Sequence, residues 1–186
     1  MTLRCILAPL ASPDTLRGQV TDADWAAAAA FPPRRQAEYL TWRAVVYREL
    51  GAVPIGYDAA GAPVLTGSDC CISVAHCADR IAVCISPKRC AVDIEPASRD
   101  FSRAESRYTT PSERALSDDP LWPGIVWCAK EALYKYSGRR ELDFRKDLRI
   151  GSADLAAGRL TGRIGNGEPV ELSVRREDGF ILVCIL

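Results

Sequence analysis

Hydrophobic and polar positions in the first third of the chain predict a strand followed by two helices. Residues 3–8 are typical of a strand, and the alanine-rich segment 23–30 is typical of a short helix. From Arg34 to Leu50 the apolar residues recur at steps of three and four, and Gly51 follows directly. This spacing predicts an amphipathic helix that ends at a glycine.

The middle of the chain has the pattern of an antiparallel meander. Three runs rich in β-branched residues span 71–75, 81–86 and 90–95, and the segments between them are short enough for hairpins. Before these runs, the segment from Tyr57 to Pro63 has the composition of a turn. We therefore expect three consecutive strands, each paired with the next.

The second half begins with a helix-start signal and ends in strands. Thr110-Pro111-Ser112-Glu113 combines a capping threonine, a proline in the first turn and a glutamate three residues after the cap. A longer helix is expected over 124–137, with Gly138 at its end. Four short strands are then predicted at 148–150, 160–164, 170–174 and 180–185. The whole pattern indicates an α+β protein.

Composition narrows the class of protein. The chain has 186 residues, 48% of them hydrophobic, and its 24 basic and 24 acidic residues cancel. This balance argues against nonspecific binding of nucleic acid, and no apolar run is long enough to span a membrane. The first residues are more typical of a strand than of a signal peptide, so we expect a cytoplasmic protein.

Eight cysteines raise the question of a metal site or disulfides. They form no CxxC pair, and the chain has one histidine, so the spacing of a zinc site is absent. The simplest interpretation is that most of these thiols are small buried hydrophobic groups in a reducing compartment.

Asp93 and Glu95 carry the first candidate chemistry. On a strand, alternation places them on the same face, about 7 Å apart, with Val92 and Ile94 on the other. Two carboxylates so placed repel one another unless a cation lies between them, and Mg²⁺ suits such ligands when water and phosphate complete its shell. The alternative is an ordinary strand with a solvated acidic face.

A second group lies on the helix predicted over 124–137. Glu131 and Lys135 are four residues apart and share a face, while Lys130 projects about 100° away. A surface ion pair would explain this spacing equally well. However, the chain has only four lysines, and two of them lie here. An ammonium group can transfer a proton, which arginine cannot, so the choice of lysine favours a chemical role.

His76 is the third candidate. It directly follows the run 71–75, so it is expected at the same end of the sheet as the acidic pair. Near a metal and phosphates it would donate a hydrogen bond rather than bind the metal. A satisfied histidine in a turn is the alternative.

Together these residues resemble the signature of a known family. Asp93-Ile94-Glu95, followed by Trp127-x-x-Lys130-Glu131-Ala132-x-x-Lys135, is similar to the two motifs of the 4′-phosphopantetheinyl transferases, and specifically of their monomeric surfactin-type branch. Arg34-Arg35, Arg43, Gly61-x-Pro63 and His76 fall where that branch carries further motifs. The similarity is strong over 70–140 and weaker back to 34.

The resemblance implies a fold and an activity. Two similar α+β subdomains, here 1–96 and 97–186, would be related by a pseudo-twofold axis, with coenzyme A and Mg²⁺ in the cleft between them. The reaction would transfer the phosphopantetheine arm of coenzyme A to a serine of an apo acyl or peptidyl carrier protein, releasing adenosine 3′,5′-bisphosphate. Because one chain supplies both halves, a monomer is expected, with no nucleic acid or membrane partner.

The resemblance also implies residue roles. Asp93, Glu95 and Glu131 would bind Mg²⁺, Glu131 or a metal-bound water would deprotonate the serine, and Lys135 would assist the leaving phosphate. The residues expected to bind coenzyme A are Arg34, Arg35, Arg43, His76 and Lys130. Ala62, Ala75 and Ala91 depart from the family pattern, where lysine, serine and glycine are usual. The alternative function is a catalytically silent relative that binds coenzyme A or a carrier protein.

Overall fold

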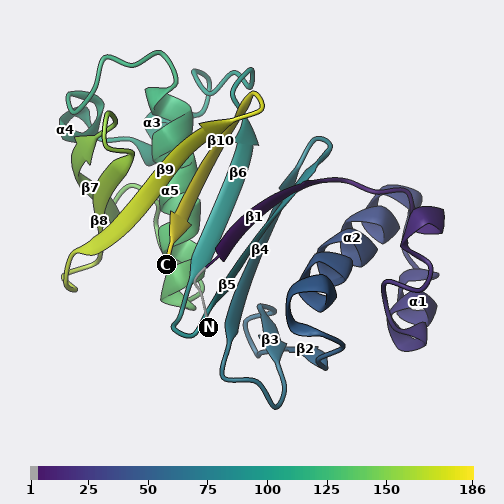
Figure 1. Ribbon diagram of the computed structural model, residues 1–186. Coiled ribbons are helices and arrows are strands. Elements are labelled where there is room, and N and C mark those ends of the chain that lie inside the picture. The colour runs from purple at the N-terminus through teal and green to yellow at the C-terminus, as the bar shows by residue number, and fades with distance from the viewer. Residues whose placement is uncertain (1–3) are drawn as a thin grey trace.

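The computed structural model describes residues 4–186 as two larger antiparallel sheets, each packed against a long helix, and a small two-stranded sheet (Figure 1). The elements of the first half are β1 (Arg4–Pro9), a 3₁₀ turn (Pro13–Leu16), α1 (Asp22–Ala28), α2 (Pro33–Leu50), β2 (Ile55–Tyr57), β3 (Pro63–Leu65), β4 (Cys71–Cys77), β5 (Arg80–Ser86) and β6 (Ala91–Pro96). Those of the second half are α3 (Glu105–Tyr108), α4 (Pro111–Arg114), α5 (Trp122–Ser137), β7 (Leu148–Asp154), β8 (Arg159–Ile164), β9 (Val170–Glu177) and β10 (Phe180–Ile185). The predicted α+β class is confirmed.

The N-terminal sheet has the order β1-β5-β4 and is covered by α2. Helix α2 begins at Pro33, whose fixed φ suits the first turn, and is followed by Gly51 at a φ of 77°. Trp42 and Val46 of α2 pack against Ile81 and Val83 of β5. The predicted strand 3–8 corresponds to β1, and residue 3 lies outside the described residues.

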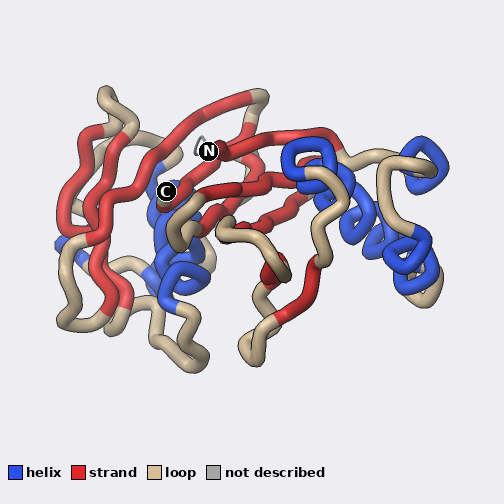
Figure 2. Tube along the Cα trace, turned by 60° about the horizontal axis from the view of Figure 1, so that its bottom comes forward, coloured by secondary structure: helices blue, strands red, loops and turns tan. Residues whose placement is uncertain are grey.

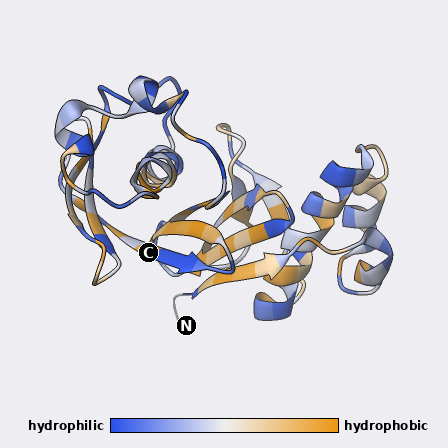
Figure 3. Ribbon diagram, turned by 90° about the horizontal axis from the view of Figure 1, so that it is seen from above, coloured by the Kyte–Doolittle hydropathy of each residue, from blue (hydrophilic) through white to orange (hydrophobic). Residues whose placement is uncertain are grey.

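The C-terminal sheet has the order β6-β10-β9-β8-β7 and curves around α5. A view from above shows α5 end-on inside this curve (Figure 3). Ile125, Ala129 and Leu133 of α5 are fully buried against the sheet. The helix ends where Gly138 takes a left-handed φ of 63°, as the glycine in the sequence predicts. The capping box at Thr110 and Glu113 is also present, at the start of α4.

The predicted meander is correct for its first two strands and wrong for the third. Strands β4 and β5 form a hairpin, but β6 pairs with β10, so that Ile94 lies opposite Leu182. The reason is burial, since Val92 and Ile94 pack with Leu182 in a core between the two sheets. Hydrogen bonding thus assigns β6 to the C-terminal sheet. The expected subdomain boundary after residue 96 counts the same strand with the N-terminal half. That boundary stays a prediction.

The strands occupy the middle of the molecule, with α1 and α2 toward one end (Figure 2). A core of residues from both sheets joins the two halves; its fully buried members include Ala82, Cys84, Val92 and Leu182. Within the described residues, no helix combines the length and hydropathy that crossing a bilayer would require.

Two glycines, one in the turn before β8 and one in the turn after it, provide a test of this packing. Gly158 and Gly165 both have a left-handed φ, but a Cβ at 158 would lie 2.8 Å from the carbonyl oxygen of Val174, whereas one at 165 would meet nothing within 4 Å. Each alanine substitution costs about 1–2 kcal/mol of backbone strain. We predict that Gly158→Ala loses about 1–3 kcal/mol more unfolding free energy than Gly165→Ala, measured by chemical denaturation. Equal losses would contradict the packing described.

Candidate active site

The site is built where α5 packs across β6. The ammonium group of Lys135, in the last turn of α5, donates to the Asp93 Oδ1 atom at 2.8 Å and to the carbonyl oxygen of Val92 at 2.9 Å. Asp93 is on β6, so these bonds join the two motifs that the sequence singled out. The structure thus brings Asp93 and Lys135 into direct contact, while their roles stay a prediction.

Asp93 is the most buried of the acidic candidates. Its side chain is 11% exposed, and its Oδ2 atom is buried with no hydrogen-bond partner among the described residues. Burial raises the pKa of Asp93, Glu95 raises it further, and the Lys135 ammonium opposes the change. An unpartnered buried carboxylate oxygen is costly, so this atom is available to a cation.

Glu95 is held by two groups from different elements. Its Oε1 atom is ion-paired with Arg99, on the loop after β6, and accepts a hydrogen bond from the Trp127 indole nitrogen at 3.2 Å. The Arg99 guanidinium also lies over the Trp127 ring, 5.6 Å from its centre. Sequence reasoning missed Arg99. Its only signal in the sequence is the position of a basic residue four places after Glu95. Trp127 is part of the second motif, but the sequence analysis assigned no role to it.

Glu131 faces the same site from α5. Burial, Asp93 and Glu95 raise the pKa of Glu131 from 4.5 to about 7, and Lys135 and Arg99 oppose the change. The oxygens of the three acidic side chains do not form a group within 4.8 Å of one another in the described part of the chain. A single ion that touched all three would therefore require side-chain movement from the arrangement described.

Arg34, Arg35 and His76 gather around a buried glutamate that sequence reasoning missed. Glu38 pairs with the Arg34 Nε atom at 3.0 Å, with the Arg35 Nη1 atom at 3.7 Å and with the His76 Nδ1 atom at 3.4 Å. Burial lowers the pKa of His76; Glu38 opposes this, while Arg35 and Lys135 add to it. The influence of Lys135 places this basic group near the acidic site.

Arg43 does not occupy the position expected of a phosphate ligand. It is 1% exposed, and its Nε atom donates to the Asp24 Oδ1 atom at 2.8 Å. Its guanidinium carbon lies 3.5 Å from the centre of the Tyr39 ring and 4.1 Å from that of Trp42. This arrangement ties α1 to α2 and leaves the Nη1 atom buried without a partner, so Arg43 is a core residue here and its coenzyme A contact stays a prediction.

Lys130 is likewise part of the core. It is 0% exposed, and its ammonium group donates to the carbonyl oxygens of Tyr108 at 2.6 Å and Phe144 at 2.8 Å and to Glu113 at 2.9 Å. The rotation of about 100° per residue that turns Glu131 toward the site turns Lys130 into the C-terminal core. The ammonium group of Lys130 has all its donors satisfied inside the core, so the structure offers no contact to a ligand, and its binding of coenzyme A stays a prediction.

A cavity of about 260 Å³ lies between the two halves, next to Lys135. The turn 60–63 and residues Ser73 and Val74 form one side, and the end of α5 forms the other. Arg140 donates to the carbonyl oxygen of Ala59 at 2.6 Å, which links the two sides. The cavity brings the Gly61-x-Pro63 segment to Lys135, as a ligand bound between the halves would require.

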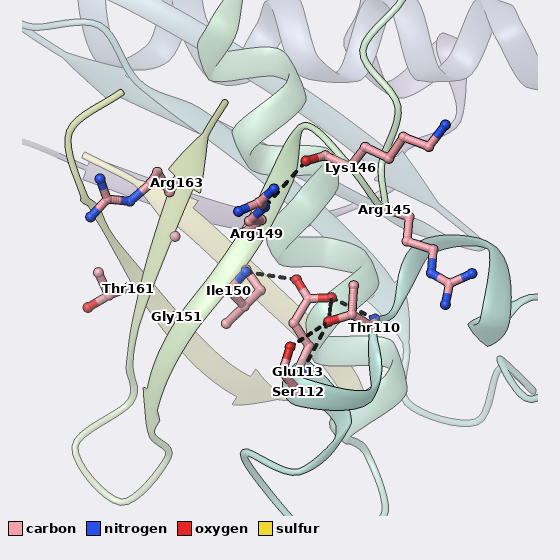
Figure 4. A pocket seen from close by; sticks show the side chains of 11 residues that line it. Thr110, Ser112, Glu113, Arg145, Lys146, Arg149, Ile150, Gly151, Thr161 and Arg163 are labelled. Carbon is pink, nitrogen blue, oxygen red and sulfur yellow. Dashed lines mark hydrogen bonds between the residues drawn. The ribbon is translucent and has the colours of Figure 1, made fainter. Parts of the chain in front are cut away.

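A larger cavity, of about 630 Å³, lies on the C-terminal half alone. Its lining includes Thr110, Glu113, Arg149 and Arg163, and none of the predicted site residues (Figure 4). Glu113 spans this wall by accepting hydrogen bonds from the backbone nitrogens of Thr110 and Ile150, both at 2.8 Å. Arg149 and Arg163 lie opposite one another on β7 and β8, and their guanidinium groups end apart from one another in the close-up (Figure 4).

Comparison with known proteins agrees with the motifs at this site. A sequence model of the 4′-phosphopantetheinyl transferase superfamily matches residues 89–182, about half of the chain. The chain therefore belongs to this superfamily, whose general activity is phosphopantetheinyl transfer. The match includes Asp93, Glu95, Glu131 and Lys135 but not the basic group around Glu38, and the surfactin-type branch stays a prediction. No individual curated protein matches the chain.

The buried pair of Lys130 and Glu113 yields a stability prediction. Glu113→Gln leaves the Lys130 ammonium buried without its counter-charge, so the free energy of unfolding should fall by about 3–5 kcal/mol. The matched control is Glu105→Gln, which breaks the more exposed pair with Arg114 and should cost at most about 1 kcal/mol. Similar losses in both variants, measured by urea denaturation, would show that Lys130 is not charged in the core.

The raised pKa of Glu131 yields a pH prediction. Its folded value of about 7 lies above its ordinary value of 4.5, so the folded state keeps a proton that the unfolded chain releases. The stability that this proton confers is complete below pH 4.5 and is lost as the pH rises through about 7. In chelator-treated protein, Glu131→Gln should therefore be progressively more stable than the wild type over this range. A constant difference in unfolding free energy across the range would contradict this.

Proposed function

We propose that the chain transfers the 4′-phosphopantetheine arm of coenzyme A to a serine of an apo carrier protein, with Mg²⁺ as the metal. The observation that carries the proposal is the bond from Lys135 on α5 to Asp93 on β6, with Glu131 near enough to Asp93 and Glu95 for their charges to raise its pKa. The family activity supports the reaction class, and the residues present supply each part that it needs.

The donor set fits a hard divalent ion. All candidate ligands are carboxylate oxygens, and the Oδ2 atom of Asp93 is buried without a partner. When bound, Mg²⁺ would neutralise the pyrophosphate of coenzyme A. Asp93 and Glu95 would hold it from β6, and Glu131 would hold it from α5.

Glu131 is suited to accept the proton of the attacking serine. A general base works best when its pKa is close to the working pH, and burial beside two carboxylates raises the pKa of Glu131 to about 7. Ordinary glutamate, near 4.5, would be a much weaker base. The value of about 7 is that of the metal-free site, and a bound Mg²⁺ would lower it.

Lys135 is placed to meet the charge that develops on the departing nucleotide phosphate. Its ammonium group is bonded to Asp93 on one side and lines the cavity between the halves on the other. The 29% exposure of its side chain leaves it reachable by a ligand in that cavity. A cation held there stabilises the leaving phosphate without a further conformational change.

Coenzyme A is proposed to occupy the cavity beside Lys135, with phosphate groups toward His76, Arg34 and Arg35. The Arg34 and Arg35 guanidinium groups are exposed and share the single counter-charge of Glu38, so this group carries positive charge in excess. His76, whose pKa burial lowers, would contribute a hydrogen bond rather than a charge. Ala62 lines the cavity where related enzymes carry a lysine, so one cationic contact is absent here. We further propose a monomer, because residues of both halves line this cavity.

The test is to incubate the protein with coenzyme A, Mg²⁺ and apo carriers of the acyl and peptidyl classes. The carrier mass should increase by one phosphopantetheine group and not in a carrier whose acceptor serine is replaced by alanine. Glu95→Gln should lower the rate by about 100-fold or more, because one of three metal-binding carboxylates is neutralised. Glu105→Gln, away from the site, should keep the wild-type rate, and circular dichroism would confirm that both variants are folded.

Two outcomes would reject the proposal. If no carrier gains mass although calorimetry detects coenzyme A binding, the chain is the catalytically silent relative. If Glu95→Gln transfers at the wild-type rate under limiting Mg²⁺, Glu95 is not a metal ligand.

A further inference from the structure

Three cysteines that are far apart in the sequence meet between the two sheets. Cys5 on β1, Cys84 on β5 and Cys184 on β10 have their sulfur atoms within 4.8 Å of one another. Cys5 and Cys84 are direct partners in the N-terminal sheet, whereas Cys184 comes from the C-terminal sheet. We call these residues the thiol triad.

The triad is enclosed by the core that joins the two halves. Cys84 is 0% exposed and Cys184 is 3% exposed, while Cys5 is half-buried and provides access from outside. All three are free thiols. Ala82 and Val92 pack in the same core, which also contains the thiols of Cys90 and Cys77 outside the group of three.

A nearby cation favours loss of protons from the triad. Arg175 on β9 donates to the carbonyl oxygen of Cys5 at 3.0 Å, and its charge opposes protonation of both Cys5 and Cys184. Hydrogen bonds from the Cys5 and Cys84 thiols lower the pKa of Cys184, whereas the hydrogen bond with Cys184 raises the pKa of Cys5 to about 12 and also raises that of Cys84. The other two protons are lost to solvent only when a cation replaces them.

We propose that the thiol triad is a binding site for one thiophilic metal ion of the Cu⁺ or Zn²⁺ class. An ion about 2.3 Å from each of three sulfurs requires sulfurs about 3.8–4.0 Å apart, so the triad needs to contract by less than about 1 Å. Three thiolates without a fourth protein ligand suit the low coordination of Cu⁺, whereas Zn²⁺ would take an external fourth ligand beside Cys5. Arg175 offsets part of the remaining negative charge.

The consequence of binding is a link between the two sheets. Strands β1 and β5 belong to one sheet and β10 to the other, so a bound ion ties both to a single point. An ion that binds only the folded arrangement stabilises it in proportion to its affinity. The triad is built from residues that the proposed transferase reaction does not use, so the two proposals stand or fall separately.

The experiment is anaerobic loading of the intact protein with Cu⁺ or, in a parallel arm, Zn²⁺, followed by desalting and native mass spectrometry. We expect one ion per chain in the wild type and a raised midpoint of thermal unfolding. X-ray absorption should report three sulfur neighbours. The metal that stays bound at the lower free concentration is the one with the higher affinity for the site.

Cys84→Ala and Cys184→Ala should each weaken binding by at least about 100-fold, more than the loss expected for an outer-shell group. The matched control is Cys90→Ala, which removes a buried thiol from the same core but not from the triad. If Cys84→Ala or Cys184→Ala does not fold, metal retention is measured in Cys5→Ala instead, because Cys5 is only half-buried. No retained ion in the wild type, or equal retention in the triad variants and the control, would overturn the proposal.

Discussion

The ion pair between Asp93 and Lys135 is the contact on which the arrangement of the site depends. It joins β6 to the last turn of α5, and a second bond from the same ammonium group reaches the Val92 carbonyl oxygen. Because α5 is held on the other side by fully buried Ile125 and Leu133, this end of the helix has little freedom to shift. The position of Glu131, one turn earlier on the helix, follows from this packing.

Asp93, Glu95 and Glu131 place three carboxylates in one half-buried site, and their mutual repulsion affects both the pKa of Glu131 and the affinity of the site for a cation. Asp93 and Glu95 make Glu131 harder to ionise, which moves the pKa of Glu131 toward neutrality. The same repulsion makes a cation favourable at this place. Arg99 and Lys135 provide part of that compensation from the protein itself, which explains how three carboxylates are tolerated together.

The proposed ligand sites lie where the two sheets and their helices meet. The cavity beside Lys135 and the thiol triad both draw residues from β1–β5 on one side and from α5 or β10 on the other. A protein of two packed halves has its least regular surface at their junction, so side chains from distant segments converge there. The larger cavity beside Thr110 and Arg163 lies within one half and lacks this convergence.

Local sequence determined the helices, the capping box at Thr110 and Glu113, and the acidic and lysine motifs, because periodicity, caps and spacing act over a few residues. Only the tertiary structure decided that β6 pairs with β10, since burial of Val92 and Ile94 depends on a strand ninety residues later in the chain. It also decided that Arg43 and Lys130 are core residues and that Cys5, Cys84 and Cys184 meet. Charge and spacing do not reveal which partner a side chain will find, because partners from distant segments are chosen by packing.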